Sequence, residues 1–233
     1  MEIKTALLCQ FKDPEEYFAS FHAHHARIFD WIFYIDHNSK KEYRALDLKN
    51  TKIYRTDIEN FTKDLFLARV IQDIRINFDF NFLFILDIDE FLPQTGKLSF
   101  DEFLLGYLNS AVGTLYWRNG YPLLMAPLID APTIFATKQL GNTKKLFYNL
   151  KRLGSFFPKE GNHNADYSFL GQTRIQIRPH RQKESRSLLH LPIISKAQLY
   201  QKLHAYPKDD FRAKIDMPQD LEYFDLTPES LLN

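Results

Sequence analysis

The chain has one cysteine, almost no net charge and no long apolar run, and each absence excludes a class of protein. Cys9 alone cannot form a disulfide within the chain, and no CxxC or Cys/His set exists for a structural zinc ion. The apolar part of MEIKTALLCQF is too short to span a bilayer and lacks a signal-peptide layout. We therefore expect a protein of a reducing, cytoplasmic compartment, with a peripheral contact to the inner face of the cell membrane left open.

Apolar residues, by contrast, are plentiful, and basic residues are concentrated in one segment. The 233 residues include 21 Phe and 12 Tyr, enough for one large domain with a substantial core. Residues 138–186 carry 11 basic and 3 acidic side chains, whereas the formal net charge of the whole chain is +1. Such a segment suits the phosphates of a donor or an anionic acceptor, and it is equally typical of a solvated basic face.

Short apolar runs alternate with helical patterns through the first half of the sequence. The run NFLFIL is too short and too continuously apolar for anything but a buried strand, and Pro14 suits the first turn of a helix. This alternation predicts an α/β fold with a mostly parallel sheet flanked by helices, followed by an irregular C-terminal region. We predict strands at 3–10, 31–35, 51–54, 81–86, 113–118 and 173–178, and helices at 14–26, 64–77, 99–109 and 195–204. The last two helices are predicted from capping boxes that begin at Ser99 and Ser195.

The segment NFLFILDIDEFLPQTG, residues 81–96, carries the strongest chemical signal. Its strand delivers Asp87, Asp89 and Glu90 at the carboxyl end, which is where ligands bind in open α/β sheets. Residues i and i+2 of an extended segment point the same way, so Asp87 and Asp89 can converge on one cation. Oxygen ligands indicate Mg²⁺ or Mn²⁺ with positions left for phosphate. The alternative is that Asp87 caps a helix while Asp89 and Glu90 are solvated turn residues.

The order of these motifs resembles the nucleotide-binding half of GT-A glycosyltransferases. The chain is most similar to bacterial members of glycosyltransferase family 2 and a related family 92-like group. The resemblance rests on LLCQFKDPEEYF, HAHH at 22–25, WIFYIDHNS at 31–39 and FLFILDIDEFL at 82–92, and covers roughly residues 3–117. A fainter match follows in Gly161-Asn162-His163 and Leu189-His190-Leu191-Pro192. The resemblance as a whole implies a single GT-A-like, Rossmann-like domain over 1–233, with a nucleotide-sugar half at 1–117 and an acceptor-side half at 118–233.

The resemblance also implies roles for individual residues. Asp36 would lie near the nucleotide base, Asp87 and Asp89 would bind ribose and metal, and His190 would be a third protein ligand of Mn²⁺ or Mg²⁺. The sequence departs from the family where Lys12-Asp13 replaces Asn-Glu, and where Lys40 and Lys41 stand in place of an acid.

Several other residues are candidates for the same site. Asp57 and Lys145 are candidates for the donor site, Lys145 as a phosphate contact or as a surface charge. An inverting reaction needs a general base to take the acceptor proton, and Asp166, Asp130 and His163 are candidates for it. Trp117 could stack on a sugar or pack in the core. His22, His24 and His25 splay in different directions from one helix, which favours packing over metal binding.

These observations favour a metal-dependent glycosyltransferase. It would move a sugar from a nucleoside diphosphate donor, with a UDP-sugar as first choice, to a glycan or glycolipid hydroxyl such as a lipopolysaccharide or capsule precursor. One alternative is a nucleotidyltransferase on a similar sheet, although the glycine-rich loop expected after the first strand is missing. The other is a nucleic-acid-binding module using residues 138–186, which leaves the DIDE carboxylates unexplained because they would repel a phosphate backbone.

Overall fold

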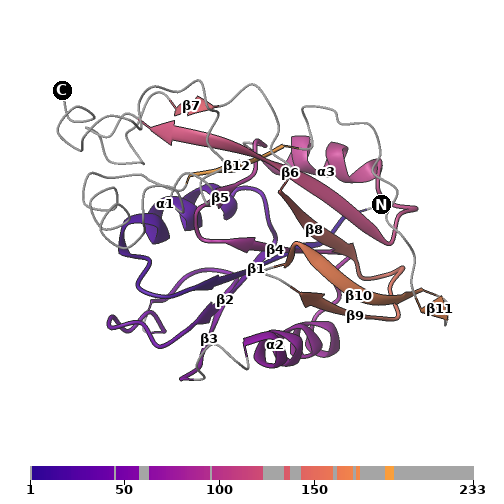
Figure 1. Cartoon of the computed structure of the whole chain (residues 1–233), viewed down its shortest axis with the longest axis horizontal. Coiled ribbons are helices and arrows are strands. Elements are labelled where there is room, and N and C mark those ends of the chain that lie inside the picture. The colour runs from indigo at the N-terminus through magenta and orange to yellow at the C-terminus, as the bar shows by residue number, and fades with distance from the viewer. Residues whose placement is uncertain are drawn as a thin grey trace.

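A computed structural model describes the chain over residues 2–44, 46–57, 63–94, 96–122, 134–136, 143–159, 162–169, 172–173 and 187–191. Within these ranges, strands and helices alternate through the first half and strands dominate the second (Figure 1). The helices are α1 (Glu15–His25), α2 (Lys63–Asn77) and α3 (Lys97–Leu105). The strands are β1 (Thr5–Phe11), β2 (Trp31–Asp36), β3 (Thr51–Arg55), β4 (Phe82–Asp87), β5 (Glu90–Phe91), β6 (Val112–Pro122), β7 (Ile134–Ala136), β8 (Lys144–Asn149), β9 (Ser155–Lys159), β10 (Asn164–Phe169), β11 (Gln172–Thr173) and β12 (Ser187–His190).

The main sheet has the order β3-β2-β1-β4-β8-β6-β12-β5, with β7 paired to β6. Strands β3, β2, β1 and β4 are parallel to their neighbours. Parallel pairing requires long connections, which are supplied by α1 between β1 and β2, by residues 37–50 between β2 and β3, and by α2 between β3 and β4. Beyond β4 the sheet is mixed: β8 is antiparallel to both β4 and β6, and β12 is parallel to β6. The predicted α/β class with a Rossmann-like parallel core is confirmed, and the strands come from both predicted halves of the chain.

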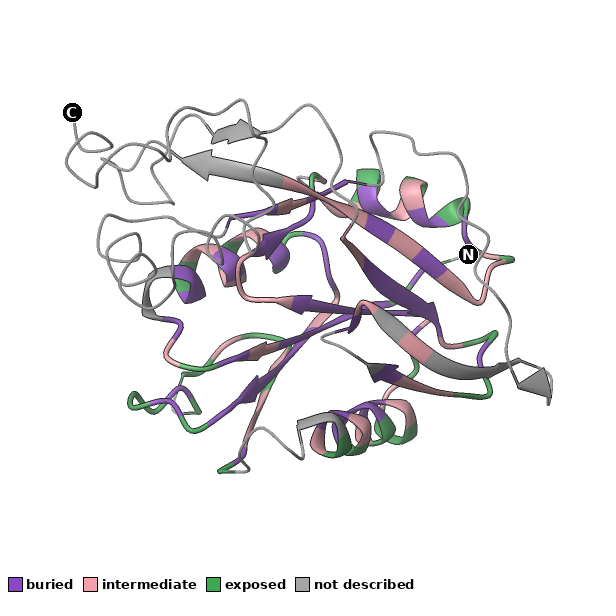
Figure 2. Cartoon of the chain, in the orientation of Figure 1, coloured by how far each residue is buried: buried purple, intermediate pink, exposed green. Residues whose placement is uncertain are grey.

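Helices cover both faces of this sheet (Figure 1). Alternate residues of each strand face opposite sides, so Leu7 joins the cluster under α1 and α3 while Leu8 joins the cluster under α2. The central strands β1, β2 and β4 are buried except for one residue each, Gln10, Trp31 and Asp87 (Figure 2), which explains their nearly continuous apolar sequence. Within the described part of the chain, no helix is both long and apolar enough to cross a membrane.

The start of α3 differs from the prediction. The helix begins at Lys97 rather than after a Ser99 cap; Gly96 precedes it in an extended conformation, and no side-chain cap is formed. Ser99 instead lies inside the first turn, where its hydroxyl donates to the Gly96 carbonyl at 3.0 Å. The capping-box prediction at Ser99 was therefore wrong, and the helix ends at Leu105 rather than near residue 109. The second predicted capping box and its helix lie outside the described residues, as does most of the predicted strand at 173–178.

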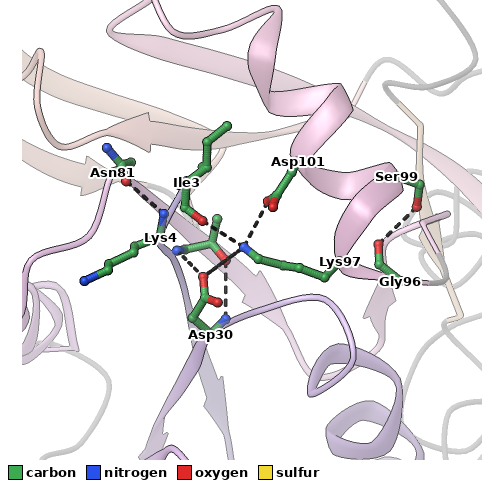
Figure 3. Close-up of polar contacts among 9 residues, drawn as sticks. Ile3, Lys4, Asp30, Asn81, Gly96, Lys97, Ser99 and Asp101 are labelled. Atoms are coloured by element: carbon green, nitrogen blue, oxygen red, sulfur yellow. Dashed lines mark hydrogen bonds and ion pairs between the residues drawn. The ribbon is translucent and has the colours of Figure 1, made fainter. Parts of the chain in front are cut away.

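Lys97 anchors α3 to the amino end of the sheet (Figure 3). Its ammonium nitrogen lies 2.9 Å from a carboxylate oxygen of Asp30 and 2.9 Å from one of Asp101, and it donates to the Ile3 carbonyl at 3.0 Å. Asp30 also accepts from the backbone N–H of Thr5 at 2.7 Å. This network ties the helix to the beginnings of β1 and β2.

The histidines of α1 belong to the packing, as their splayed directions predict. His24 Nε2 lies 2.9 Å from the Leu92 carbonyl oxygen, and His25 is fully buried against Phe21 and Phe91. Burial lowers the pKa of His25 well below its usual value, with the neighbouring His24 adding to the shift. These rings are therefore core residues that hold the loop after β5 against α1.

Candidate active site

The acidic segment lies at the point where the order of successive strands in the sheet reverses. The chain passes from β1 outward to β2 and β3, and then returns to place β4 on the other side of β1. Gln10, near the end of β1, is paired with Asp87 at the end of β4. Ligands of open α/β folds bind outside the carboxyl ends of the strands at such a switch point. Asp87 therefore lies where this fold class places its ligand.

The three acidic residues of the DIDE segment have different environments. Asp87 and Asp89 have side chains that are 45% and 24% exposed, whereas the Glu90 side chain is fully buried. Glu90 folds back so that its carboxylate accepts the backbone N–H of Asp87 at 2.7 Å. Glu90 therefore braces the turn, and Asp87 and Asp89 remain the two carboxylates that a ligand can reach.

Lys145 on β8 extends into this acidic cluster. Its ammonium nitrogen lies 2.6 Å from Asp87 Oδ2 and 3.6 Å from Glu90 Oε1, and its side chain is fully buried. The interpretation of Lys145 as a surface charge was therefore wrong. No sequence spacing signals this contact, because 58 residues separate Lys145 from Asp87. The contact arises because β8 is the antiparallel neighbour of β4.

The charged groups of this cluster shift one another's pKa values. Burial alone would lower the pKa of Lys145, but Glu90, Asp87 and Asp89 outweigh that effect and raise it, so Lys145 is cationic. Burial raises the pKa of Glu90 well above its usual value, against the attraction of Lys145. The Lys145 ammonium thus lies among three acidic side chains, of which Asp87 and Asp89 are partly exposed.

The sheet also brings His190 to this cluster from a distant part of the sequence. Strand β12 pairs with β5 so that His190 lies opposite Glu90, and the backbone N–H of Leu191 donates to the Asp89 carbonyl at 2.8 Å. His190 Nε2 consequently lies 3.5 Å from Asp89 Oδ2.

Trp117 supports His190 from the neighbouring strand β6. The two rings stack with centroids 4.0 Å apart and planes inclined by 18°. His163 meets Trp117 edge-on at 5.5 Å, and its Nδ1 lies 2.7 Å from the Lys144 carbonyl oxygen. Because a carbonyl can only accept, Nδ1 of the neutral ring carries the proton and Nε2 carries the lone pair. The rings of His163, Trp117 and His190 thus form a row that ends beside Asp89.

Asp36 and Asp57 lie at the carboxyl edge of the other strands. Asp36 is fully buried; its Oδ1 accepts the Ser39 backbone N–H at 2.8 Å, and its Oδ2 lies 3.6 Å from Arg55 Nη1. It therefore holds the turn after β2. Asp57 follows β3 and is exposed. Both lie at the same end of the parallel strands as Asp87; β1 separates Asp36 from it, and β2 and β1 separate Asp57 from it.

Two of the proposed catalytic bases have no described side chain. Asp130 lies outside the described residues, and Asp166 lies on β10, paired with Phe157 of β9, where only its backbone is described. His163, whose side chain is described, is connected to the acidic cluster through Trp117 and His190.

The donor atoms can be tested for their fit to a divalent cation. Among the described residues, no group of three or more His, Cys, Asp or Glu side chains is arranged to hold a metal ion. Two donors are nevertheless close: neighbouring ligands of an octahedral ion lie about 3 Å apart, and Asp89 Oδ2 and His190 Nε2 are 3.5 Å apart. Asp87 lies two residues away and bonds Lys145. The spacing of Asp89 and His190 is therefore that of two neighbouring ligands of one octahedral ion.

Comparisons with known proteins add little to this geometry. No family model and no curated protein matches the chain. Among solved structures it is similar to residues 1–349 of TarS from S. aureus, with 12% identity, a TM-score of 0.36, and coverage of 51% of this chain and 36% of that one. It is also similar to the bifunctional IspDF from Campylobacter jejuni, with 12% identity, a TM-score of 0.33, and coverage of 64% and 42%. The match thus spans less than half of either protein, and no functional argument rests on it.

Proposed function

We propose that this chain is a glycosyltransferase that takes a sugar from a nucleoside diphosphate donor, with a UDP-sugar as first choice. The observation that carries the proposal is the pair Asp87 and Asp89 at the switch point of the sheet, with His190 within 3.5 Å of Asp89. The acceptor would be a hydroxyl of a glycan or glycolipid, such as a lipopolysaccharide or capsule precursor. The enzyme would be located in the cytoplasm, with a peripheral contact to the inner face of the cell membrane.

Asp89 and His190 would hold a Mn²⁺ or Mg²⁺ ion, with Asp87 beside them. When bound, such an ion stabilises the charge that develops on a diphosphate leaving group. Lys145 neutralises part of the negative charge of Asp87 and Glu90. Glu90 accepts the Asp87 N–H and so fixes the turn that carries the two exposed carboxylates, those of Asp87 and Asp89. The residues of this chain thus hold and orient the donor end of the reaction.

His163 is our first choice for the group that takes the acceptor proton. Its Nδ1 lies 2.7 Å from the Lys144 carbonyl oxygen, so Nδ1 carries the proton in the neutral ring, and imidazole is the side chain that most often serves as a general base. Asp166 and Asp130 stay alternatives. His163→Gln should reduce transfer while leaving donor binding intact, whereas an unchanged transfer rate would remove His163 from consideration.

The test of the function is the release of nucleoside diphosphate from a panel of nucleotide sugars, with and without Mn²⁺. We expect one donor to be turned over only with the metal, and Asp89→Asn to abolish that turnover. Glu102→Gln, at an exposed position of α3, serves as the comparison and should leave turnover unchanged. Release of pyrophosphate from a nucleoside triphosphate would point to nucleotidyl transfer instead and would contradict the proposal.

A further inference from the structure

Strands β4 and β8 separate before they reach the acidic cluster. Their antiparallel register runs from Phe82↔Asn149 to Phe84↔Phe147, whereas β4 continues to Asp87 and β8 begins at Lys144. The backbone groups of the two strands beyond this register need other partners, because a buried carbonyl without a hydrogen bond is costly.

The Asn162 side chain is the partner of one carbonyl on each strand. Its Nδ2 donates to the Ile85 carbonyl of β4 at 2.9 Å and to the Leu146 carbonyl of β8 at 2.7 Å. Its Oδ1 accepts from the Tyr148 hydroxyl, so every polar atom of the side-chain amide is bonded. The side chain is buried, with the residue 1% exposed, and its φ of 70° is one that asparagine tolerates better than most residues. A single amide thus bridges the two strands where their own pairing ends.

Lys145 lies beside this bridge. The carbonyl on one side of it, that of Leu146, is bonded by Asn162, and the carbonyl on the other side, that of Lys144, is bonded by His163. The consecutive residues Asn162 and His163 therefore fix the backbone on both sides of Lys145. That backbone directs the buried ammonium to Asp87 and Glu90.

We propose that Asn162 is a positioning residue: it holds the separation between β4 and β8 and thereby places Lys145 against the carboxylates of the site. What those carboxylates bind rests on the proposed function, but the placement of Lys145 does not. The two questions can therefore be tested separately on the full chain.

The first measurement needs no metal. Lys145 is labelled with an amine-reactive reagent, and its modification rate is followed by peptide mass spectrometry, with Lys97 as the reference in the same sample. In Asn162→Gly, which keeps the backbone free to adopt a positive φ, we expect labelling of Lys145 to accelerate at least about tenfold, because three buried hydrogen bonds are lost.

Asn149 offers a matched control at the other end of the same strand. It is also buried, and its Nδ2 faces two carbonyl oxygens, those of Tyr107 at 3.4 Å and Leu108 at 3.2 Å. Asn149→Gly should destabilise the fold without accelerating Lys145 labelling. Equal acceleration in both variants, or none in Asn162→Gly, would overturn the proposal. If Asn162→Gly does not fold, Tyr148→Phe decides: removal of the hydroxyl that orients Asn162 should accelerate labelling about threefold, and an unchanged rate would overturn the proposal.

The second measurement is calorimetric titration with Mn²⁺. Asn162→Gly should bind Mn²⁺ about tenfold more weakly than the unmodified chain, while Asn149→Gly should match it. If the unmodified chain binds no Mn²⁺, the proposed function fails, and the labelling rates alone decide the role of Asn162. If it binds Mn²⁺ and both variants bind equally well, the link between Asn162 and the site is excluded.

Discussion

Two lysines, one at each end of the sheet, show how similar groups produce a structural contact in one place and a candidate site in the other. At the amino end, Lys97 meets Asp30 and Asp101, and Asp30 is also satisfied by donors from Thr5. At the carboxyl end, Lys145 faces Asp87 and Glu90 with Asp89 nearby, and Asp87 keeps 45% of its side chain exposed.

The difference lies in how far the charged groups are buried. Around Lys97, the ammonium also donates to the Ile3 carbonyl and the Thr5 hydroxyl, and the side chains of Lys97, Asp30 and Asp101 are each about one-third exposed. Around Lys145, the side chains of Lys145 and Glu90 are fully buried, whereas Asp87 and Asp89 keep 45% and 24% of theirs exposed. A buried ammonium beside partly exposed carboxylates therefore distinguishes the carboxyl end of the sheet from the amino end.

The largest expected effect is on stability, and it sharpens the contrast between the lysines. Lys145→Met leaves Glu90 buried without its cation, which should lower the free energy of unfolding at pH 7 by about 3–5 kcal/mol. Lys97→Met removes a pair that is about one-third exposed, so the loss should be about 1 kcal/mol. Urea denaturation of both variants measures the two values. Equal losses would mean that the two ends of the sheet do not differ as described.

The next effect concerns Asp89. Asp89→Asn should weaken Mn²⁺-dependent binding of UDP at least about hundredfold, because loss of supporting residues around a metal already costs 10–100-fold. The melting temperature of Asp89→Asn should differ little from that of the unmodified chain, because the backbone carbonyl of residue 89 still accepts the Leu191 N–H. Isothermal calorimetry checks the binding, and binding equal to that of the unmodified chain would exclude Asp89 as a ligand.

His190 allows ligation to be separated from packing. His190→Ala removes both the nitrogen beside Asp89 and the ring that stacks on Trp117, whereas His190→Phe keeps an aromatic ring against Trp117. If His190 is a ligand, both variants should bind Mn²⁺ about tenfold more weakly. If only the alanine variant is impaired, the contribution of His190 is packing.

The smallest effect is the pH dependence contributed by His25, which lies away from both lysines. Its folded-state pKa is lowered by burial, so the unfolded chain takes up a proton near pH 6.5 that the folded chain refuses. This contribution to stability is complete above about pH 6.5 and is lost as the pH falls, by up to about 1.4 kcal/mol per pH unit. His25→Phe, in an aromatic environment, should flatten the loss between pH 7 and 5.5 relative to the unmodified chain. An unchanged slope in chemical denaturation would contradict the assignment.

Local patterns predict the first half of this structure well because its strands are buried on both faces. NFLFIL predicts β4 within one residue, and the pattern following Asp64 predicts α2. The start of α3 is missed because Lys97 is fixed by Asp30 and Ile3, contacts that no helix-capping pattern contains. The acidic residues at the end of β4 can be recognised in the sequence, but the groups that surround them cannot. Lys145 contacts Asp87 because β8 pairs with β4, and Asn162 bridges these two strands although it lies far from β4 in the sequence.

The measurement that tests the central claim most directly is calorimetric titration of the unmodified chain with UDP, in the presence of Mn²⁺ and again in the presence of a chelator. The acidic cluster should bind UDP only together with the metal, at one Mn²⁺ per chain, and Glu102→Gln, at an exposed position of α3, should not alter the metal stoichiometry. Equally tight binding of UDP in the chelator, or Mn²⁺ binding that survives Asp89→Asn, would contradict the account.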